Sequence, residues 1–529
     1  MVGHCCFLVH IKSVCGIIRP LPSFLRCSMA QLSLALEQQE LETRLFEAAN
    51  ILRGPVDAAD FKTYIFPLLF FKRISDVYDE EYRRALNDSG GDLDYASFNE
   101  HHRFKIPEGC RWGTVQETSI DVGKALQDAF QCIETANQQT LSGIFGDASW
   151  TNKERLSDEL LRDLVNHFSG IPLSNAAVSG DILGQAYEYL IKKFADATNK
   201  KAGEFYTPRS IVRLLIDILD PKEGETIYDP ACGTGGMLLE AVQHVRTSGG
   251  NPRTLLGRLY GQEKNLTTSS IARMNLLLHD VEDFHIARGD TLRHPVFFTD
   301  GKLTTFDCVI ANPPFSLERW GEENWEHDHY GRNVAGVPPR DNGDYAWVQH
   351  MLSSMQPQSG RMAVVLPHGV LFRMGAEGRI RQRLIEDDLL DAVIGLGSNL
   401  FYGTGLAACI LVFRKQKPAK NRQRVLVIDG SRLYKRGRKQ NTLEPDHASQ
   451  ILNWYLTYKD VPGAVRAVPL SEIAGNNWNL NITRYIEPVV AEQSMSVEEA
   501  LINLQVAVDD AQAAEERLRV LLRNNGLAD

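Results

Sequence analysis

The sequence predicts an α/β protein in which a Rossmann-like, mainly parallel sheet follows an all-helical N-terminal domain and precedes a C-terminal helix. Before residue 170, apolar residues recur at every third and fourth position, which indicates amphipathic helices. After residue 170, short apolar runs alternate with helical stretches, which is typical of a doubly wound sheet. A chain of 529 residues also exceeds the size at which one core stops growing, so we expect more than one domain.

The domain boundaries follow from these changes in pattern. We expect an extension without structure over residues 1–28, a helical domain over 29–170, the sheet domain over 171–430 and a C-terminal region over 431–529. The extension lacks the layout of a signal peptide, and Met29 is an alternative start. From Val497 to Leu522, apolar residues alternate at four-residue and three-residue spacing, which predicts a helix with a narrow seam. That seam either packs on its own domain or docks with a partner.

Within the helical domain, the two clearest periodic runs are LALEQQELETRLFEAANILRG and DFKTYIFPLLFFKRISDVYDEEYRRAL. Gly54 and Pro55 separate the runs, and Asp60 is placed to cap the second one. Within the sheet domain, we expect strands at TIYDP, DCVIANP, RMAVVLP, DAVIGL, ACILVFR and RVLVID, and helices at PRSIVRLLIDIL and YAWVQHMLSSM. Ligands of such sheets bind beyond the carboxyl ends of the strands.

Composition and residue spacing argue against a disulfide-rich, metal-binding or membrane-spanning protein. The chain is 43% hydrophobic and 23% charged, which is ordinary for a globular protein. If DNA is the substrate, the net charge of -10 indicates that a partner supplies many of the contacts with the DNA phosphates. The nine cysteines show no paired metal spacing, so we expect neither a disulfide framework nor a metal site, and a reducing cytoplasm fits best. No apolar run reaches the roughly 18 residues of a membrane helix, so we expect no membrane.

A glycine-rich turn marks a candidate cofactor site. In ETIYDPACGTGGMLLEAV, a strand leads to Asp229, then to Gly233, Gly235 and Gly236, and then to a helix whose free N–H groups face the turn. Alone, this pattern also fits an ordinary connection between a strand and a helix. Glu263 and Asp290 end the next two strands, where carboxylates can accept ribose hydroxyls and an adenine amine. No lysine of a phosphate loop follows the glycines, so we expect a nucleoside ligand without a triphosphate.

A second motif directly follows the strand FDCVIA. Asn312, Pro313, Pro314 and Phe315 form a rigid turn, because two prolines end the strand. The Asn312 amide oxygen and the Pro313 carbonyl are acceptors, and two acceptors aimed at an exocyclic amine make its nitrogen nucleophilic. Phe315 can stack on a base that has left the double helix. A strand ended by prolines beside a buried aromatic is the purely structural alternative, which the position after the glycine turn disfavours.

These motifs resemble those of a known family. DPACGTGGML, NPPF and GEFYTPRSIVRLL are similar to motifs I, IV and X of the amino-methyltransferases that act on DNA adenine. LRGPVDAADFKTYIFPLLFFKRISDVYDEEY resembles the N-terminal signature of the modification subunits of type I restriction-modification systems. The resemblance covers residues 40 to 430 and the C-terminal helix. It implies an AdoMet-dependent methyltransferase fold and a site-specific DNA adenine-N6 methyltransferase activity.

The resemblance also implies the roles of individual residues. It implies that the catalytic residues are Asn312, Pro313, Pro314 and Phe315. It implies contacts with S-adenosyl-L-methionine (AdoMet) for Glu204, Phe205, Tyr206, Thr207, Pro208, Arg209, Asp229, Gly233, Thr234, Gly235, Gly236, Glu263 and Asp290. The segment LFYGTGLAACILVFRK departs from the family pattern at Ala407, Ala408 and Cys409, where polar residues are commoner. That departure concerns how the target base is seated.

Partners follow from the same resemblance. It implies double-stranded DNA, a specificity (S) subunit that reads the sequence, a second copy of the modification subunit and a restriction (R) subunit. The cluster SRLYKRGRKQN, with Arg432, Lys435, Arg436, Arg438 and Lys439, is either a phosphate contact or a solvated surface loop. The competing functions are methyl transfer to a protein glutamine or to RNA, and a scaffold that binds AdoMet without catalysis.

Overall fold

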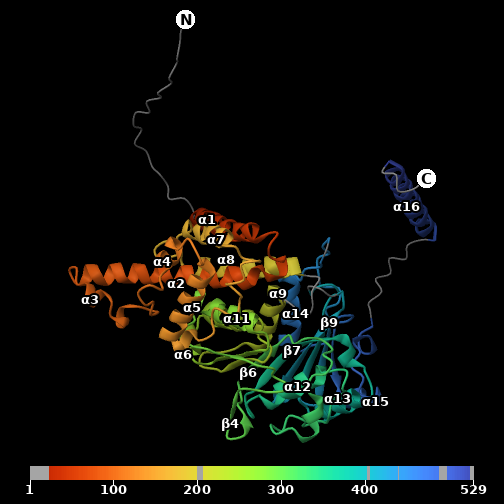
Figure 1. The fold of residues 1–529 in the computed structure, drawn as a ribbon. Helices are drawn as coiled ribbons and strands as arrows, with labels where there is room; N and C mark the ends of the chain where they lie inside the picture. The colour runs from red at the N-terminus through yellow and green to blue at the C-terminus, as the bar shows by residue number, and fades with distance from the viewer. Residues whose placement is uncertain (1–22, 199–206, 402–404, 439, 488–496, 525–529) are drawn as a thin grey trace, which may run out of the picture.

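The computed structural model describes residues 23–198, 207–401, 405–438, 440–487 and 497–524. A layer of helices from the first part of the chain lies against one side of a large sheet, and the last helix stands apart from both (Figure 1). The predicted combination of a helical domain, an α/β sheet and a C-terminal helix is therefore confirmed.

The helical domain is built from long amphipathic helices and short connecting ones. Its helices are α1 (Ser23–Leu52), α2 (Phe61–Asp88), α3 (Leu93–Ala96), α4 (Trp112–Glu117), α5 (Val122–Ala136), α6 (Gln138–Leu141), α7 (Asp158–Ser169) and α8 (Gly180–Thr198). Aromatic rings fill much of the core, where Phe130 stacks on Phe145 with ring centroids 4.2 Å apart. Helix α8 falls in the expected sheet domain, but Leu183 and Leu190 on it are buried in this helical core.

The start of the helical domain differs from expectation in two details. Residues 1–22 of the expected extension lie outside the described residues, but α1 already begins at Ser23. Asp60 is the N-cap residue of α2, but its side chain makes no capping hydrogen bond. It pairs with Arg155 instead, and Asp57 caps the short 3-10 turn before it by accepting the Ala59 N–H at 3.0 Å. The ion pair with a distant residue was not visible in the local pattern.

The main sheet has nine strands in the order β11-β10-β8-β9-β7-β6-β1-β2-β3. The strands are β1 (Ile227–Asp229), β2 (Leu259–Glu263), β3 (His285–Arg288), β6 (Cys308–Ala311), β7 (Arg361–Pro367), β8 (Leu390–Gly395), β9 (Ala408–Arg414), β10 (Arg424–Asp429) and β11 (Val465–Pro469). Strands β9 and β11 run antiparallel to their neighbours, and the remaining pairs are parallel. The seven parallel strands therefore end at one edge of the sheet. A separate hairpin is formed by β4 (Phe298–Thr299) and β5 (Lys302–Leu303).

Helices cover both faces of the sheet, so its central strands are buried throughout. On one face, the core includes residues of α9 (Arg209–Leu219), α10 (Gly236–Thr247) and α14 (Pro445–Thr457). On the other face, it includes residues of α12 (Asp344–Ser353), α13 (Ala376–Glu386) and α15 (Leu470–Gly475). Helix α11 (Leu266–Leu278) contributes Ile271 and Met274 to the helical core, which joins the two domains.

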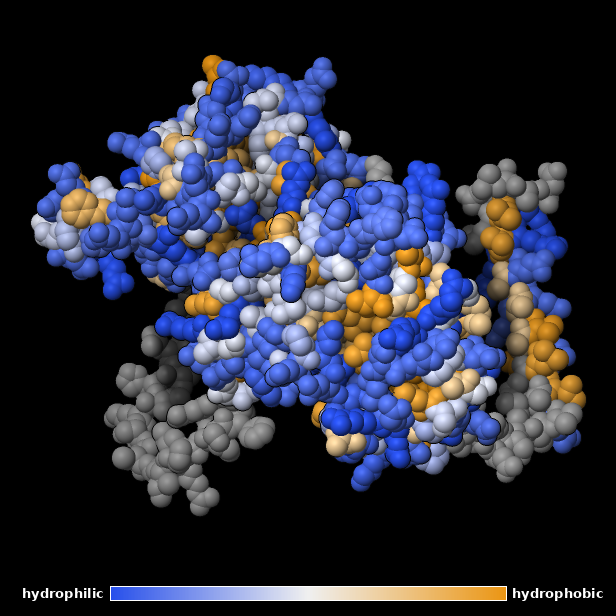
Figure 2. Space-filling model, turned by 90° about the horizontal axis from the view of Figure 1, so that it is seen from below, coloured by the Kyte–Doolittle hydropathy of each residue, from blue (hydrophilic) through white to orange (hydrophobic). Residues whose placement is uncertain are grey.

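The sheet continues past the expected boundary at residue 430. Strand β11 pairs antiparallel with β10, and Val465 and Val468 on it are buried. A short edge strand with a turn-rich approach resembles a loop in sequence, which is why the pattern did not reveal it. Helix α16 (Val497–Asn524) exposes its apolar residues, and Figure 2 shows them as a hydrophobic column at one side of the molecule. None of the helices among the described residues is long and apolar enough to cross a membrane.

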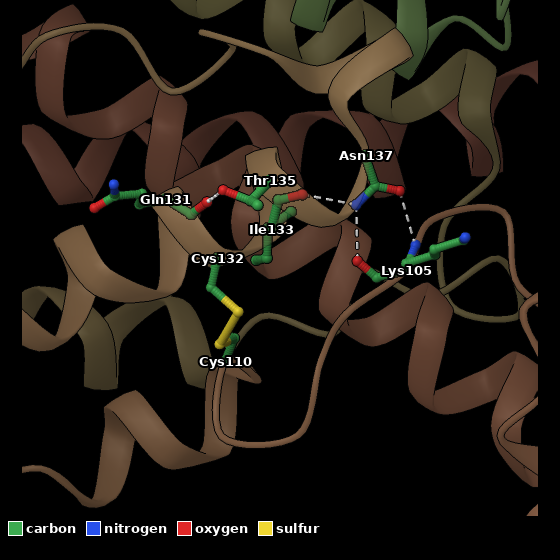
Figure 3. Close-up of a disulfide and its surroundings, with 7 residues drawn as sticks. All are labelled: Lys105, Cys110, Gln131, Cys132, Ile133, Thr135 and Asn137. Atoms are coloured by element: carbon green, nitrogen blue, oxygen red, sulfur yellow. Dashed lines mark hydrogen bonds between the residues drawn. A yellow bond between two sulfur atoms is a disulfide. The ribbon is translucent and has the colours of Figure 1, made fainter.

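One disulfide departs from the expected absence of a disulfide framework. Cys110 and Cys132 are bonded, which ties the loop before α4 to α5 (Figure 3). The same loop is held by Asn137, whose amide donates to the Lys105 carbonyl at 2.8 Å and accepts the Lys105 N–H at 2.9 Å. The two cysteines are 22 positions apart in the sequence, and only the packing of the loop on α5 brings them together.

Candidate active site

The glycine turn connects β1 with α10 as the sequence predicts. Asp229 ends β1 and accepts the Ala231 N–H at 3.0 Å, which shapes the first half of the turn. Gly235 is the N-cap residue of α10 and has a φ of 79°, a left-handed conformation that disfavours side chains. Gly233, with a φ of 52°, would place a Cβ in open space, so its lack of a side chain leaves room in front of the turn.

Glu263 lies beside this turn at the end of the neighbouring strand. One of its carboxylate oxygens accepts the Gly233 N–H at 3.1 Å, and the other accepts the Asn265 N–H at 2.8 Å. The Cys232 N–H donates to the Gln262 carbonyl at 3.1 Å and ties the turn to β2. These bonds fix the Glu263 side chain at the sheet edge.

A cavity of about 210 Å³ opens above this edge. It brings together eight of the residues selected from the sequence: Thr207, Asp229, Gly233, Thr234, Gly236, Glu263, Asn312 and Pro314. The candidate cofactor turn and the candidate catalytic turn therefore line the same cavity, although 76 residues separate Gly236 from Asn312.

Several predicted residues lie elsewhere. Arg209 does not line this cavity but faces a second, polar hollow, with its guanidinium 3.2 Å from Glu188 and 3.5 Å from Glu240. Asp290 is also absent from the lining and lies 2.9 Å from the Lys264 ammonium. Pro208, Gly235, Pro313 and Phe315 adjoin the cavity in sequence without lining it, and Glu204, Phe205 and Tyr206 fall outside the described residues.

Sequence reasoning missed one wall of the cavity. The helical domain contributes Lys62 and Phe66 from α2, and Ile191, Phe194 and Ala195 from α8. On a helix, apolar positions of this kind look the same whether they face a core or a ligand. Only the packing of α2 and α8 over the sheet edge identifies them as part of the site.

The candidate catalytic turn begins where the buried strand β6 ends. The Asn312 side-chain amide donates to the Thr207 hydroxyl at 2.8 Å, so the segment before α9 orients it. The amide oxygen of Asn312 is buried and has no hydrogen-bond partner among the described residues. A buried acceptor without a partner is costly, and it marks a position where a ligand's N–H group would be stabilised.

The residue after the turn is held by a buried ionic cluster. The backbone N–H of Ser316, which has a φ of 49°, donates to Asp344 at 2.8 Å. Asp344 is fully buried and pairs with Arg373, which also bonds the buried Glu377. Burial raises the pKa of the Glu377 carboxyl despite the neighbouring Arg373. This cluster fixes the turn, and the Phe315 ring lies 6.1 Å from the Phe401 ring in an edge-on contact.

The segment that follows, residues 317–342, has a small core of its own. Trp320 and Trp325 are buried with their ring centroids 4.9 Å apart, and they pack with Trp347 of α12. Arg332 lies over the Trp325 ring and forms a buried ion pair with Asp328. The segment is therefore a folded part of the domain that directly follows the candidate catalytic turn.

The electrostatics of the cavity centre on one carboxyl group. Burial, reinforced by the nearby Glu263, raises the pKa of Asp229 to about 8. Burial also raises the pKa of the Cys232 thiol well above its usual value. Burial thus favours the protonated, neutral forms of Asp229 and Cys232, and a cationic ligand would favour the ionised form of Asp229.

Comparisons with known proteins agree with this geometry. Residues 178–494 match the family model of the N-6 DNA methylase, and residues 41–168 match that of the HsdM N-terminal domain. The methylase subunit of the type I restriction enzyme MjaVIII from Methanocaldococcus jannaschii is 33% identical over 86% of this chain and 79% of its own length. That of HindI from Haemophilus influenzae is 30% identical over 79% of this chain and 98% of its own length.

A solved structure extends the similarity to three dimensions. The type I restriction-modification methyltransferase subunit from Streptococcus thermophilus is 31% identical, with a TM-score of 0.75 over 85% of this chain and all of that one. Fold and site thus define a methyltransferase. The chain belongs to the N-6 DNA methylase family, as a modification subunit of the type I restriction-modification class.

Proposed function

We propose that this modification subunit transfers the methyl group of AdoMet to the N6 amine of a flipped adenine in double-stranded DNA. The observation that carries the proposal is the buried amide oxygen of Asn312, which has no hydrogen-bond partner in the described part of the chain and belongs to a residue that lines the cavity of the glycine turn. An exocyclic amine has N–H groups to offer to that oxygen. The cavity that we propose for a nucleoside thus includes Asn312, whose oxygen can accept a hydrogen bond from an amine.

The residues of the cavity fit AdoMet. Gly233 and Gly236 leave open space in front of the turn, where a Cβ would meet nothing within 4 Å. Glu263 ends β2, where a carboxylate can accept the ribose hydroxyls of a nucleoside. Asp229 offers a carboxylate to the positive charges of the methionine part. AdoMet, when bound, supplies a methyl group on a positively charged sulfur, which is open to attack by a nitrogen.

The chain's own residues prepare the nucleophile. The Asn312 oxygen and the Pro313 carbonyl accept the two N–H groups of the amine and draw them out of the plane of the base. The nitrogen lone pair then leaves conjugation with the ring. The bond from Asn312 to Thr207 engages the amide nitrogen, which keeps the amide from rotating and leaves its oxygen to accept from the amine. Phe315 stacks on the base once it has left the duplex.

Selection of the target requires partners. We propose that a specificity subunit reads the DNA sequence, that two copies of this chain join it, and that a restriction subunit completes the full complex. Helix α16 supports the proposal, because Leu501, Leu504, Val508 and Leu518 follow one seam and are 40–61% exposed. A narrow apolar seam is best buried against another helix.

The test is Asn312→Ala in the complex with the specificity subunit, assayed by single-turnover methylation of a DNA duplex. Loss of one transition-state acceptor costs on the order of 3 kcal/mol, so the rate should fall at least about a hundredfold. AdoMet binding, measured by calorimetry, should stay within about threefold, because the side chain faces the amine.

A matched control is Asn421→Ala. Asn421 is buried and its amide oxygen also lacks a partner among the described residues, but it lies before β10, away from the cavity. The control should methylate like the wild type. Equal rates for Asn312→Ala and the wild type, or methylation of RNA or protein in place of adenine in DNA, would refute the proposed function.

A further inference from the structure

A strongly basic loop lies outside the site described so far. It connects β10 with α14, and its cations Arg432, Lys435, Arg436 and Arg438 are exposed. None of these four forms an ion pair with another residue in the described part of the chain, whereas many other surface cations do. In a chain with a net charge of -10, this is a local concentration of unpaired positive charge.

Hydrogen bonds connect the described residues of the loop to one another and to a neighbouring segment. Its two sides are joined by paired backbone bonds, since the Lys435 N–H donates to the Thr442 carbonyl at 2.8 Å and the Thr442 N–H returns to Lys435 at 3.0 Å. Gln440 donates to the Leu400 carbonyl at 2.7 Å, and Asn441 donates to the Ser398 carbonyl at 2.9 Å. The loop is thereby attached to residues 396–401, which follow β8.

That attachment places the loop near the catalytic turn. Strands β6, β8 and β10 point the same way in the sheet, so the loop after β10 and the turn after β6 lie at one edge. Residues 396–401 end with Phe401, whose ring contacts that of Phe315. The anchor of the basic loop thus also contacts the residue that we propose stacks on the target base.

We infer that residues 432–438 bind the phosphate backbone of the DNA beside the flipped adenine. Resting on the proposed function, this inference assigns a contact surface that this chain itself provides for its substrate. Exposed guanidinium groups match the geometry and charge of phosphates. They lie at the same edge of the sheet as Asn312, and we expect a duplex bound at that edge to extend over both. Such contacts add affinity for any sequence and leave recognition to the partner.

The test compares two triple variants at opposite ends of β10. The first, Arg432→Gln, Arg436→Gln and Arg438→Gln, neutralises the loop at the active-site edge. The second, Lys420→Gln, Arg422→Gln and Arg424→Gln, removes the same charge from exposed residues at the other edge. Both are made in the complex with the specificity subunit, and duplex binding is measured over a range of salt concentrations.

The loop variant should bind the duplex at least about tenfold more weakly at low salt. The negative slope of its log affinity against log salt should become shallower by about three, nearly one for each lost phosphate contact. The opposite-edge variant should keep the wild-type slope. AdoMet binding should be unchanged in both.

Equal slopes for the two variants would overturn the inference, because net charge alone would then explain the effect. Loss of subunit assembly by the loop variant, seen by size-exclusion chromatography, would also overturn it and assign the loop to a protein partner. A wild-type complex that methylates no DNA would instead refute the proposed function, so the two failures are distinguishable.

Discussion

The buried carboxyl of Asp229 makes AdoMet binding depend on pH. Because burial raises its pKa to about 8, only about one molecule in ten carries an ionised Asp229 at pH 7, against about nine in ten at pH 9. The positive charges of AdoMet favour the ionised form, so binding releases a proton. Lower proton concentration therefore strengthens binding, by about ninefold from pH 6 to pH 7, where the amino group of AdoMet stays protonated.

Calorimetry on the wild type and on Asp229→Asn measures this effect. The amino group of AdoMet itself loses its charge near pH 8, so the comparison is confined to about pH 6 to 7.5, where that group remains mostly protonated. In this range the ratio of wild-type to variant affinity reports the proton on Asp229, and it should rise steadily with pH. Asparagine keeps the shape of the side chain and does not titrate. A ratio that stays constant from about pH 6 to pH 7.5 would show that Asp229 is already ionised or does not face the ligand's charge.

Two other changes test the support of the site and its assembly. Thr207→Val keeps the shape of the side chain but removes the hydroxyl that accepts the hydrogen bond from the Asn312 amide. Single-turnover methylation should slow by about fivefold, which corresponds to the loss of one neutral hydrogen bond of about 1 kcal/mol. An unchanged rate would mean that this bond does not orient Asn312. Deletion of residues 494–529 should weaken assembly with the specificity subunit, seen as a shift in size-exclusion chromatography, and leave AdoMet binding intact; full assembly would assign the seam of α16 another role.

Much of the fold could be predicted because its signals are local. Buried strands such as β7 and β8 are apolar throughout, and the glycine turn needs a left-handed residue at Gly235, which the sequence supplies. The acceptors at the ends of β1, β2 and β6 were predicted for the same reason, since parallel strands end at one edge. Local pattern and tertiary structure agree at these positions.

Two of the predicted cofactor contacts have ion-pair partners that the local pattern does not reveal. Arg209 lies two positions after Thr207, which lines the cavity, and its guanidinium pairs with Glu188 of α8 and Glu240 of α10 at a second hollow. Asp290 follows a predicted strand, and its carboxylate lies within ion-pair distance of the Lys264 ammonium. None of these partners stands at a helical or strand spacing from the residue with which it pairs. The direction of a charged side chain is thus set by neighbours that only the fold supplies.

Side chains of the helical domain form one wall of the cavity, so both domains contribute to the candidate site. Phe66 of α2 and Phe194 of α8 have ring centroids 5.7 Å apart and both line the cavity of the glycine turn. Ile271 of α11 lines the same cavity and is also buried in the helical core. A ligand held there would contact both domains at once, so its binding would stabilise their packing as well as the fold of each. The helical domain is therefore a structural part of the cavity, and a change in its packing on α11 would alter the cavity wall that Ile271 provides.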